Sequence, residues 1–172
     1  EQRIRFVANS PEGFHPGRSA SVYLEGKDGG EGKLIGTLGQ LHPELQQQYD
    51  LNDVYIAEIA LEAIYSEADV DIRYRELPRF PAVERDIAVV VSKDIEAGAM
   101  LSSIREAAGE LLQTVQVFDV FTGSKLGEDK KSVAMALVYR NRERTLTDEE
   151  ITEVHARVVA RLEERFGAEL RK

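Results

Sequence analysis

The sequence predicts an α+β protein built from two successive parts. Short apolar or alternating runs in residues 1–77 predict antiparallel strands, whereas residues 78–172 alternate between strand-like runs and two amphipathic helices. Between the parts, residues 77–81 read Leu-Pro-Arg-Phe-Pro, and two prolines so close together disfavour both a helix and a central strand. We therefore expect one domain over 1–77, a second over 78–172 and a linker where they meet.

The first part shows three strand signals. They are the runs 20–24, 34–38 and 54–61, and the glycine-rich stretch 26–32 predicts a turn between the first two. So few strands in 77 residues supply little core. We expect this part to be a fragment that packs on sequence outside this chain.

The second part opens with the apolar run 87–91, which predicts a strand covered on at least one face. Apolar residues at steps of three and four then predict a helix over 95–112. Strand runs follow at 115–121 and 133–139, and the charged, glycine-containing stretch 123–131 between them predicts a solvated loop.

The second helix has the clearest signals in the sequence. Thr147 and Glu150 form a Thr-x-x-Glu capping box, an apolar stripe follows, and Gly167 predicts the end of the helix. Residues 168–171 are long enough for a last short strand. The order strand, helix, strand, strand, helix, strand is that of the ferredoxin-like split βαβ fold, in which two helices cover one face of an antiparallel sheet and leave the other free.

The two-residue period of strands predicts which side chains stand on the free face. Val117, Asp119 and Phe121 share one face of their strand, and because burying an unpaired carboxylate is costly, this face is expected to be open. In the next strand the bulky residues belong against the helices. The smaller residues left on the open face are Ser132, Ala134, Ala136 and Val138. Together they predict a flat platform for a nucleotide base, with Phe121 as the stacking surface and Asp119 as a hydrogen-bond acceptor.

The net charge of −9 argues against a nucleic-acid partner, but the acids are concentrated in the first part. Residues 1–77 carry 7 basic and 14 acidic side chains, and residues 78–172 carry 15 and 17. Residues 130–147 contain five basic side chains and one acidic side chain, Glu143, which gives a local net charge of +4. The basic residues are Lys130, Lys131, Arg140, Arg142 and Arg144. Composition alone leaves open whether they bind phosphates or belong to a solvated strand and loop.

Other functional classes lack support in the sequence. There is no cysteine, and there is no apolar run of about 18 residues to span a membrane, so a cytoplasmic location is expected. The three histidines, His15, His42 and His155, show no metal-ligand spacing. No Ser-His-Asp set or carboxylate pair can be assigned either, and we expect no catalytic residue in this chain.

Several stretches resemble the ferredoxin-fold anticodon-binding domain of bacterial phenylalanyl-tRNA synthetase β subunits, in the order and spacing of that family. They are FPAVERDIAVVV from Phe80, VFDVFTG from Val117, KKSVAMAL from Lys130, RERTLTDEEI from Arg142 and LEERFGAELR from Leu162. The first part is similar to the non-catalytic class II synthetase-like domain that precedes it in these subunits. That likeness is carried by FHPGRSASVYL from Phe14 and IGTLGQLHPEL from Ile35.

The resemblance implies a non-catalytic piece of a phenylalanine-tRNA ligase. In that family an α2β2 assembly joins phenylalanine to its tRNA; the α subunit uses ATP and Mg²⁺, and this region of β holds the anticodon. The implied partners are tRNA(Phe) and the α subunit, with neither DNA nor a membrane. No cofactor is implied for this fragment itself.

The resemblance also implies site residues. The first anticodon base would be held by Asp119, Phe121, Ser132 and Ala134. The family commonly has Tyr at the position of Phe121, so stacking would survive here but a hydroxyl contact would not. The five basic residues would serve phosphates, and Pro81 and Arg85 would border the site.

Structural alternatives remain open for these residues. Phe121 is also compatible with an ordinary half-buried aromatic, and Asp119 with a partner of a neighbouring arginine. Arg142 and Arg144 are close enough to the helix that starts at Thr147 to pair with it. The ferredoxin-like fold also hosts small-molecule-sensing modules and subunit interfaces, so fold alone does not establish RNA binding.

Overall fold

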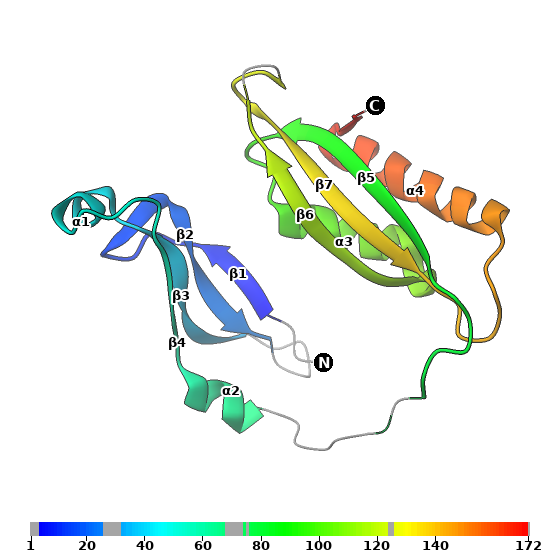
Figure 1. The fold of residues 1–172 in the computed structure, drawn as a ribbon, viewed down its shortest axis with the longest axis horizontal. Coiled ribbons are helices and arrows are strands. Elements are labelled where there is room, and N and C mark those ends of the chain that lie inside the picture. The colour runs from blue at the N-terminus through cyan, green and yellow to red at the C-terminus, as the bar shows by residue number, and fades with distance from the viewer. Residues whose placement is uncertain (1–3, 26–31, 68–73, 75, 124–125, 172) are drawn as a thin grey trace. The chain divides into compact units, whose positions relative to one another are not determined.

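The computed structural model describes residues 4–25, 32–67, 74, 76–123 and 126–171. The chain divides into two compact units, Glu1–Tyr74 and Arg75–Lys172, which are described separately below (Figure 1). The predicted turn over 26–32 lies, apart from Gly32, outside the described residues.

The first unit is a four-stranded antiparallel sheet in the order β1-β2-β3-β4, with two short helices. Its elements are β1 (Ile4–Ala8), β2 (Phe14–Leu24), β3 (Lys33–Leu41), α1 (Pro43–Gln48), β4 (Tyr55–Ile59) and α2 (Leu61–Glu67). The three predicted strand runs overlap β2, β3 and β4, but β2 begins six residues before its run and the last run extends into α2. Sequence patterns missed β1 and both helices, because each is too short to show a clear period.

The core of the first unit is small. Its buried apolar residues are Val22, Leu24, Ile35 and Ala63. Large apolar side chains remain exposed on the same sheet, including Phe6 at 57% and Leu34 at 55%. Among the described residues, this unit therefore leaves much of its apolar surface in contact with solvent. That it packs on sequence outside this chain stays a prediction.

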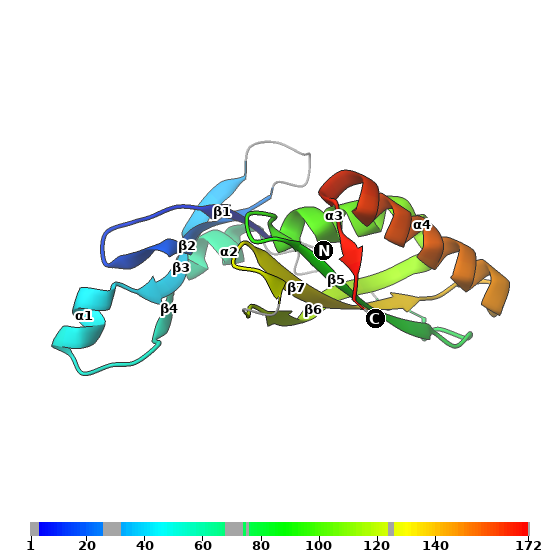
Figure 2. The same ribbon diagram turned by 90° about the horizontal axis from the view of Figure 1, so that it is seen from above.

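The second unit is a four-stranded antiparallel sheet in the order β6-β7-β5-β8. Its elements are β5 (Val83–Ser92), α3 (Ala97–Ala108), a single 3₁₀ turn η1 (Gly109–Leu111), β6 (Leu112–Phe121), β7 (Lys130–Tyr139), α4 (Asp148–Phe166) and β8 (Glu169–Leu170). Both long helices lie on one face of the sheet (Figure 2). This is the ferredoxin-like arrangement that the element order predicts.

The main core lies between that sheet and its helices. Alternate residues of β5 and β7 point into this core, and α3 and α4 each contribute an apolar stripe. The contributions of β7 are Val133, Met135, Leu137 and Tyr139, and those of α4 are Ile151, Val154, Val158 and Leu162. The opposite sheet face carries no helix among residues 76–123 and 126–171 of this unit.

The ends of the helices depend on local backbone chemistry. The capping box forms as predicted, because the Thr147 side chain accepts from the backbone N–H of Glu150 and the Glu150 side chain accepts from that of Thr147. Gly167 ends α4 with a left-handed φ of 59°. Helix α3 ends earlier than predicted, at Ala108, because Gly109 adopts a φ of 63°. Within the described part of the chain, no helix combines the length and apolar character needed to cross a bilayer.

Candidate functional site on the open sheet face

A bulge in β6 decides which of its residues share the open face. Val117 pairs with Met135 but Asp119 pairs with Ala134, which leaves Phe118 without a partner on β7. Such an extra residue shifts the side-chain alternation by one position. Val117 therefore packs against the helix-side core, as its partner Met135 does. The expectation that Val117 shares a face with Asp119 is wrong, because strict alternation does not hold across the bulge.

Beyond the bulge, the four residues proposed for a base lie side by side. Asp119 is the cross-strand partner of Ala134, and Phe121 is the partner of Ser132. Direct partners on one face of an antiparallel pair have Cβ atoms about 4.5–5.5 Å apart. Because Val133 and Met135 point into the core, Ser132 and Ala134 stand on the open face. The structure thus brings these four side chains together on that face.

The ring of Phe121 is the largest apolar group of this cluster. It is 45% exposed, and it lies so close to Gly123 that a Cβ atom there would be 2.8 Å from the ring's Cζ. The guanidinium carbon of Arg171 lies 5.8 Å from the ring centroid. The ring therefore lies beside Gly123 and Arg171 while much of its surface stays accessible.

Two polar groups of the cluster form no side-chain hydrogen bond or ion pair with another described residue. The Ser132 side chain is only 3% exposed, yet its hydroxyl makes no hydrogen bond to another described residue. Asp119 is exposed and forms no ion pair within the described ranges, so the arginine partner considered above is not found there. The buried side-chain atoms without a partner among the described residues are Ser103 Oγ and Arg140 Nε, and the Ser132 hydroxyl does not belong to this group.

Lys130 and Lys131 both contact other parts of the second unit. The Lys130 ammonium donates to the Glu169 carboxylate at 2.7 Å. Hydrogen bonding to Lys130 lowers the pKa of Glu169. Lys131 donates to the backbone carbonyl of Lys93 at 2.9 Å, and burial lowers the pKa of its ammonium. Both ammonium groups thus already have partners in the second unit.

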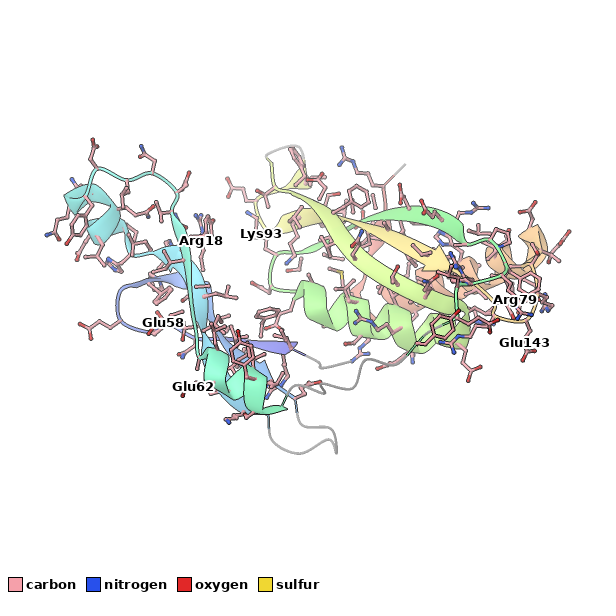
Figure 3. All side chains as sticks on the ribbon, turned by 60° about the horizontal axis from the view of Figure 1, so that its bottom comes forward. Arg18, Glu58, Glu62, Arg79, Lys93 and Glu143 are labelled. Atoms are coloured by element: carbon pink, nitrogen blue, oxygen red, sulfur yellow. The ribbon has the colours of Figure 1, made fainter. Side chains whose placement is uncertain are left out.

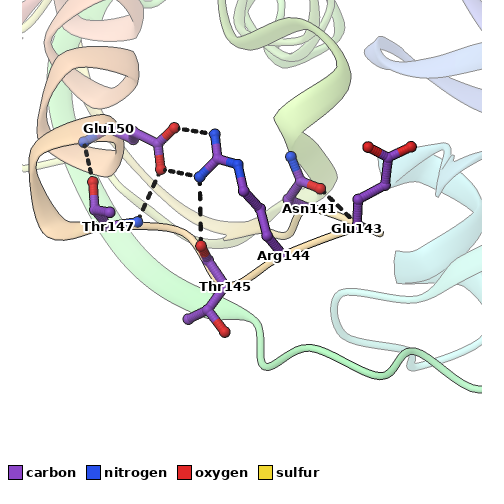
Figure 4. Close-up of polar contacts among 6 residues, drawn as sticks. All are labelled: Asn141, Glu143, Arg144, Thr145, Thr147 and Glu150. Carbon is purple, nitrogen blue, oxygen red and sulfur yellow. Dashed lines mark hydrogen bonds and ion pairs between the residues drawn. The ribbon is translucent and has the colours of Figure 1, made fainter.

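Arg144 is engaged at the start of α4 (Figure 4). Its guanidinium donates to both carboxylate oxygens of Glu150, at 2.7 Å for one of them. Glu150 also accepts from the backbone N–H of Thr147 at 3.0 Å. The hydrogen bond from Arg144, together with that from Thr147, lowers the pKa of Glu150 to about 2. The sequence left open whether Arg144 binds a phosphate or pairs with the helix. In the structure it pairs with Glu150 of that helix.

The five basic residues do not form one patch, because β7 runs between them. Lys130 and Lys131 lie at one end of this ten-residue strand and Arg140 follows its other end, roughly 30 Å away. Figure 3 shows the same separation through labelled neighbours, with Lys93 at one end of the sheet and Glu143 at the other. Arg142 is exposed, and Arg140 is half-buried with an Nε atom that has no partner among the described residues.

Pro81 and Arg85 have different positions. Pro81 is exposed just ahead of β5. Arg85 is the cross-strand partner of the buried Leu137 and so stands on the helix side of the sheet, away from Asp119 and Phe121. The structure does not bring Arg85 to the open face.

A buried polar pair also lies on the helix side. The hydroxyl of Tyr139, which is fully buried, is 3.3 Å from Nδ1 of His155. Burial raises the pKa of Tyr139 to about 12. Burial, with a smaller contribution from the Arg85 charge, lowers the pKa of His155. This pair belongs to the core and not to the candidate site.

The sequence patterns missed two neighbours of the site. Gly123 and Arg171 both lie beside Phe121, but 48 positions separate them in the sequence. Strand alternation relates only residues within a strand and its partner, so it gave no reason to choose Arg171. The described residues contain no group of three or more His, Asp or Glu side chains that could hold a metal ion.

The fold and site define a ferredoxin-like domain whose bare sheet face presents an aromatic ring beside a carboxylate and a hydroxyl. Residues 78–171 match the family model of the ferredoxin-fold anticodon binding domain, and residues 2–61 match that of the phenylalanyl tRNA synthetase beta chain CLM domain. The first match covers more than half of the chain. The chain therefore belongs to the ferredoxin-fold anticodon binding domain family.

Curated relatives are similar along nearly the whole chain. The phenylalanine-tRNA ligase beta subunit of Bacillus cereus (strain ATCC 14579) is 45% identical over 170 residues, which is 99% of this chain and 20% of that protein. The beta subunit of Geobacillus kaustophilus is 46% identical over 98% of this chain and 20% of its own length. That of Bacillus subtilis (strain 168) is 42% identical over the same shares. The chain spans about one fifth of the length of these relatives.

Proposed function

We propose that this chain is the C-terminal part of a bacterial phenylalanine-tRNA ligase β subunit, and that its second unit binds the anticodon loop of tRNA(Phe). The observation that carries the proposal is the group of Asp119, Phe121, Ser132 and Ala134, which are cross-strand neighbours on the open sheet face. Family membership and the names of the relatives support the same function.

The chemistry of this group suits an unstacked nucleotide. Single-stranded RNA is generally recognised by stacking its bases on aromatic rings and by hydrogen bonds to their edges. Phe121 offers a partly exposed ring, Asp119 offers an acceptor for base N–H groups, and the Ser132 hydroxyl lacks a partner among the described residues. Ala134 adds little bulk between them. A base lying on Phe121 would therefore have edge partners on two adjacent strands.

Phosphate contacts are proposed chiefly for Arg140 and Arg142. Arg144 is bound to Glu150, and Lys130 and Lys131 have partners in the second unit, so using any of these for phosphate means exchanging an existing contact. Arg142 is exposed and forms no ion pair with another described residue. Phosphates generally supply the salt-dependent share of RNA affinity.

The remaining assignments depend on the whole protein. We propose that residues 1–77 are the end of a non-catalytic class II synthetase-like domain and residues 78–172 the anticodon-binding domain. An α subunit in an α2β2 assembly would supply ATP- and Mg²⁺-dependent aminoacylation in the cytoplasm. The chain itself would contribute tRNA binding and no reacting group.

The test is a binding titration of the chain with a tRNA(Phe) anticodon stem-loop at low salt, followed by fluorescence anisotropy. Phe121→Ala is expected to raise Kd by about 5- to 150-fold, which corresponds to about 1–3 kcal/mol for a base stacked on an aromatic ring. Phe118→Ala is the matched control, because Phe118 is on the same strand and is 57% exposed but lies in the bulge. It should leave Kd unchanged.

A second RNA makes the test specific to one base. With a stem-loop that lacks the first anticodon base, the wild-type chain and Phe121→Ala should bind equally weakly. Equal effects of the two phenylalanine variants on the intact stem-loop would contradict the proposal. Binding of an amino acid or of another protein chain on this face, without RNA affinity, would favour a sensing or interface module instead.

A further inference from the structure

Arg171 reaches the open face from the end of the last strand. Its guanidinium carbon is 5.8 Å from the centroid of the Phe121 ring, within the range of about 6 Å in which a cation interacts with an aromatic face. Its backbone N–H donates to the carbonyl of Ala88 at 2.9 Å, in the strand next to the one that carries Ala134. The side chain thus lies within cation–π range of the ring proposed to receive a base.

The segment that carries Arg171 is held by few contacts. Strand β8 is two residues long and pairs with β5 through Glu169 with Val90 and Leu170 with Val89. The Lys130–Glu169 ion pair at 2.7 Å adds one link from β7. Since β8 is short and lies at the sheet edge, this link contributes directly to the position of Arg171.

We propose that Arg171 is part of the nucleotide site, stacking its guanidinium on the base that Phe121 holds, and that the Lys130–Glu169 pair positions it. This inference rests on the proposed function. A guanidinium is planar and stacks on aromatic faces, including those of RNA bases. The guanidinium carbon now lies 5.8 Å from the ring centroid, so Arg171 must move outward to admit a base between the two groups.

A substitution series at Arg171 separates stacking by the guanidinium from the effect of its positive charge. Arg171→Lys keeps the positive charge but removes the planar group. If Arg171 stacks on the base, Arg171→Lys and Arg171→Ala should weaken binding of the anticodon stem-loop to a similar extent, by roughly 2- to 30-fold. If Arg171→Lys instead binds like the wild type, the stacking role is overturned.

The chain provides a matched control in Arg165. Its guanidinium carbon lies 5.5 Å from the ring centroid of Phe166 on α4, on the helix side of the sheet. Arg165→Ala removes the same charge and the same kind of contact away from the open face, and it should leave Kd unchanged. Equal Kd values for Arg171→Ala and Arg165→Ala would also overturn the proposal.

The positioning role of the ion pair is tested by charge exchange. Glu169→Gln should weaken binding, and the double variant Lys130→Glu with Glu169→Lys should restore it towards the wild-type value. No loss for Glu169→Gln, or no recovery in the double variant, would refute this role. Thermal unfolding of each variant monitors folding, and Arg171→Ala should unfold at the wild-type temperature because the residue is at the end of the sheet.

Phe121→Ala, measured in parallel, separates the two hypotheses. If Phe121→Ala weakens binding and Arg171→Ala does not, the inference fails and the proposed function stands. If neither variant changes Kd, the proposed function itself fails. If both single variants weaken binding while the double variant loses less binding free energy than the sum of the two single losses, the two residues act on the same base.

Discussion

The ring of Phe121 lies directly against Gly123: a Cβ atom at position 123 would be 2.8 Å from Cζ and 3.0 Å from Cε1 of the ring. Only a residue without a side chain permits this approach. Because the ring is at the far end of a partly exposed side chain, it can move away if a methyl group is added. Gly123 therefore determines where the ring lies more than it determines stability.

Gly123→Ala is expected to displace the ring and weaken binding of the anticodon stem-loop while changing the free energy of unfolding by less than about 0.5 kcal/mol. Gly98→Ala is the control, because a Cβ there meets no atom within 4 Å and lies in α3. That variant should gain up to about 1 kcal/mol in stability and bind normally. Anisotropy titration and chemical denaturation measure both quantities; normal binding by Gly123→Ala would count against a fixed ring position.

Ser132→Ala removes a hydroxyl that has no partner among the described residues. We expect the free energy of unfolding to stay the same or rise, and RNA binding to lose about 1 kcal/mol, the usual net value of one hydrogen bond. Ser103→Ala is the comparison, because the Ser103 hydroxyl is buried without a partner among the described residues and lies on α3. It should behave likewise in denaturation and leave binding intact. A loss of stability in Ser132→Ala, with unchanged Kd, would give Ser132 a purely structural role.

Arg142→Ala is expected to weaken RNA binding at all loop sequences and to reduce the slope of log Kobs against log salt by about 0.7–1, the share of one phosphate contact. Arg105→Ala removes an exposed charge from α3 and serves as the control for net charge. Titrations at four salt concentrations give the slopes. Identical slopes for the two variants would exclude a phosphate contact at Arg142.

The start of α4 should make stability depend on pH in the acidic range. Hydrogen bonds from Arg144 and Thr147 lower the pKa of Glu150 to about 2, so the carboxylate stabilises the folded state above the unfolded pKa of about 4.5. This contribution is lost as the pH falls through the folded pKa. Glu150→Gln should therefore lower the thermal midpoint at pH 7, and its difference from the wild type should shrink towards pH 2. Glu149→Gln, in the same first turn, should show a smaller difference at pH 7.

His155 should contribute a second pH dependence nearer neutrality. Its pKa is lowered by burial, so the unfolded chain takes up a proton before the folded chain does as the pH falls below about 6.5. Stability is full above that pH and decreases below it. His155→Gln should flatten the dependence between pH 7 and 5, measured by chemical denaturation, whereas His15→Gln in the first unit should preserve it. An unchanged slope in His155→Gln would show that other groups cause it.

The sequence predicted much of the second unit because its signals are local. The capping box at Thr147 and Glu150, the stop at Gly167 and the apolar stripes each depend on residues within a few positions of one another. Helix boundaries were less accurate at Ala108, where a positive φ at Gly109 ended α3 early. The first unit was less predictable, because β1, α1 and α2 are too short to show a period.

By itself, the sequence determined the order of the elements in the second unit, the small residues of β7 on its open face and the pairing of an acid with an aromatic two positions apart. Tertiary structure alone decided that the bulge at Phe118 puts Val117 and Asp119 on opposite faces, that β7 separates the basic residues, and that Arg171 lies beside Phe121. The physical reason is that alternation and capping are properties of neighbouring residues. Bulges, strand order and contacts between distant segments arise only when strands pair across the sheet.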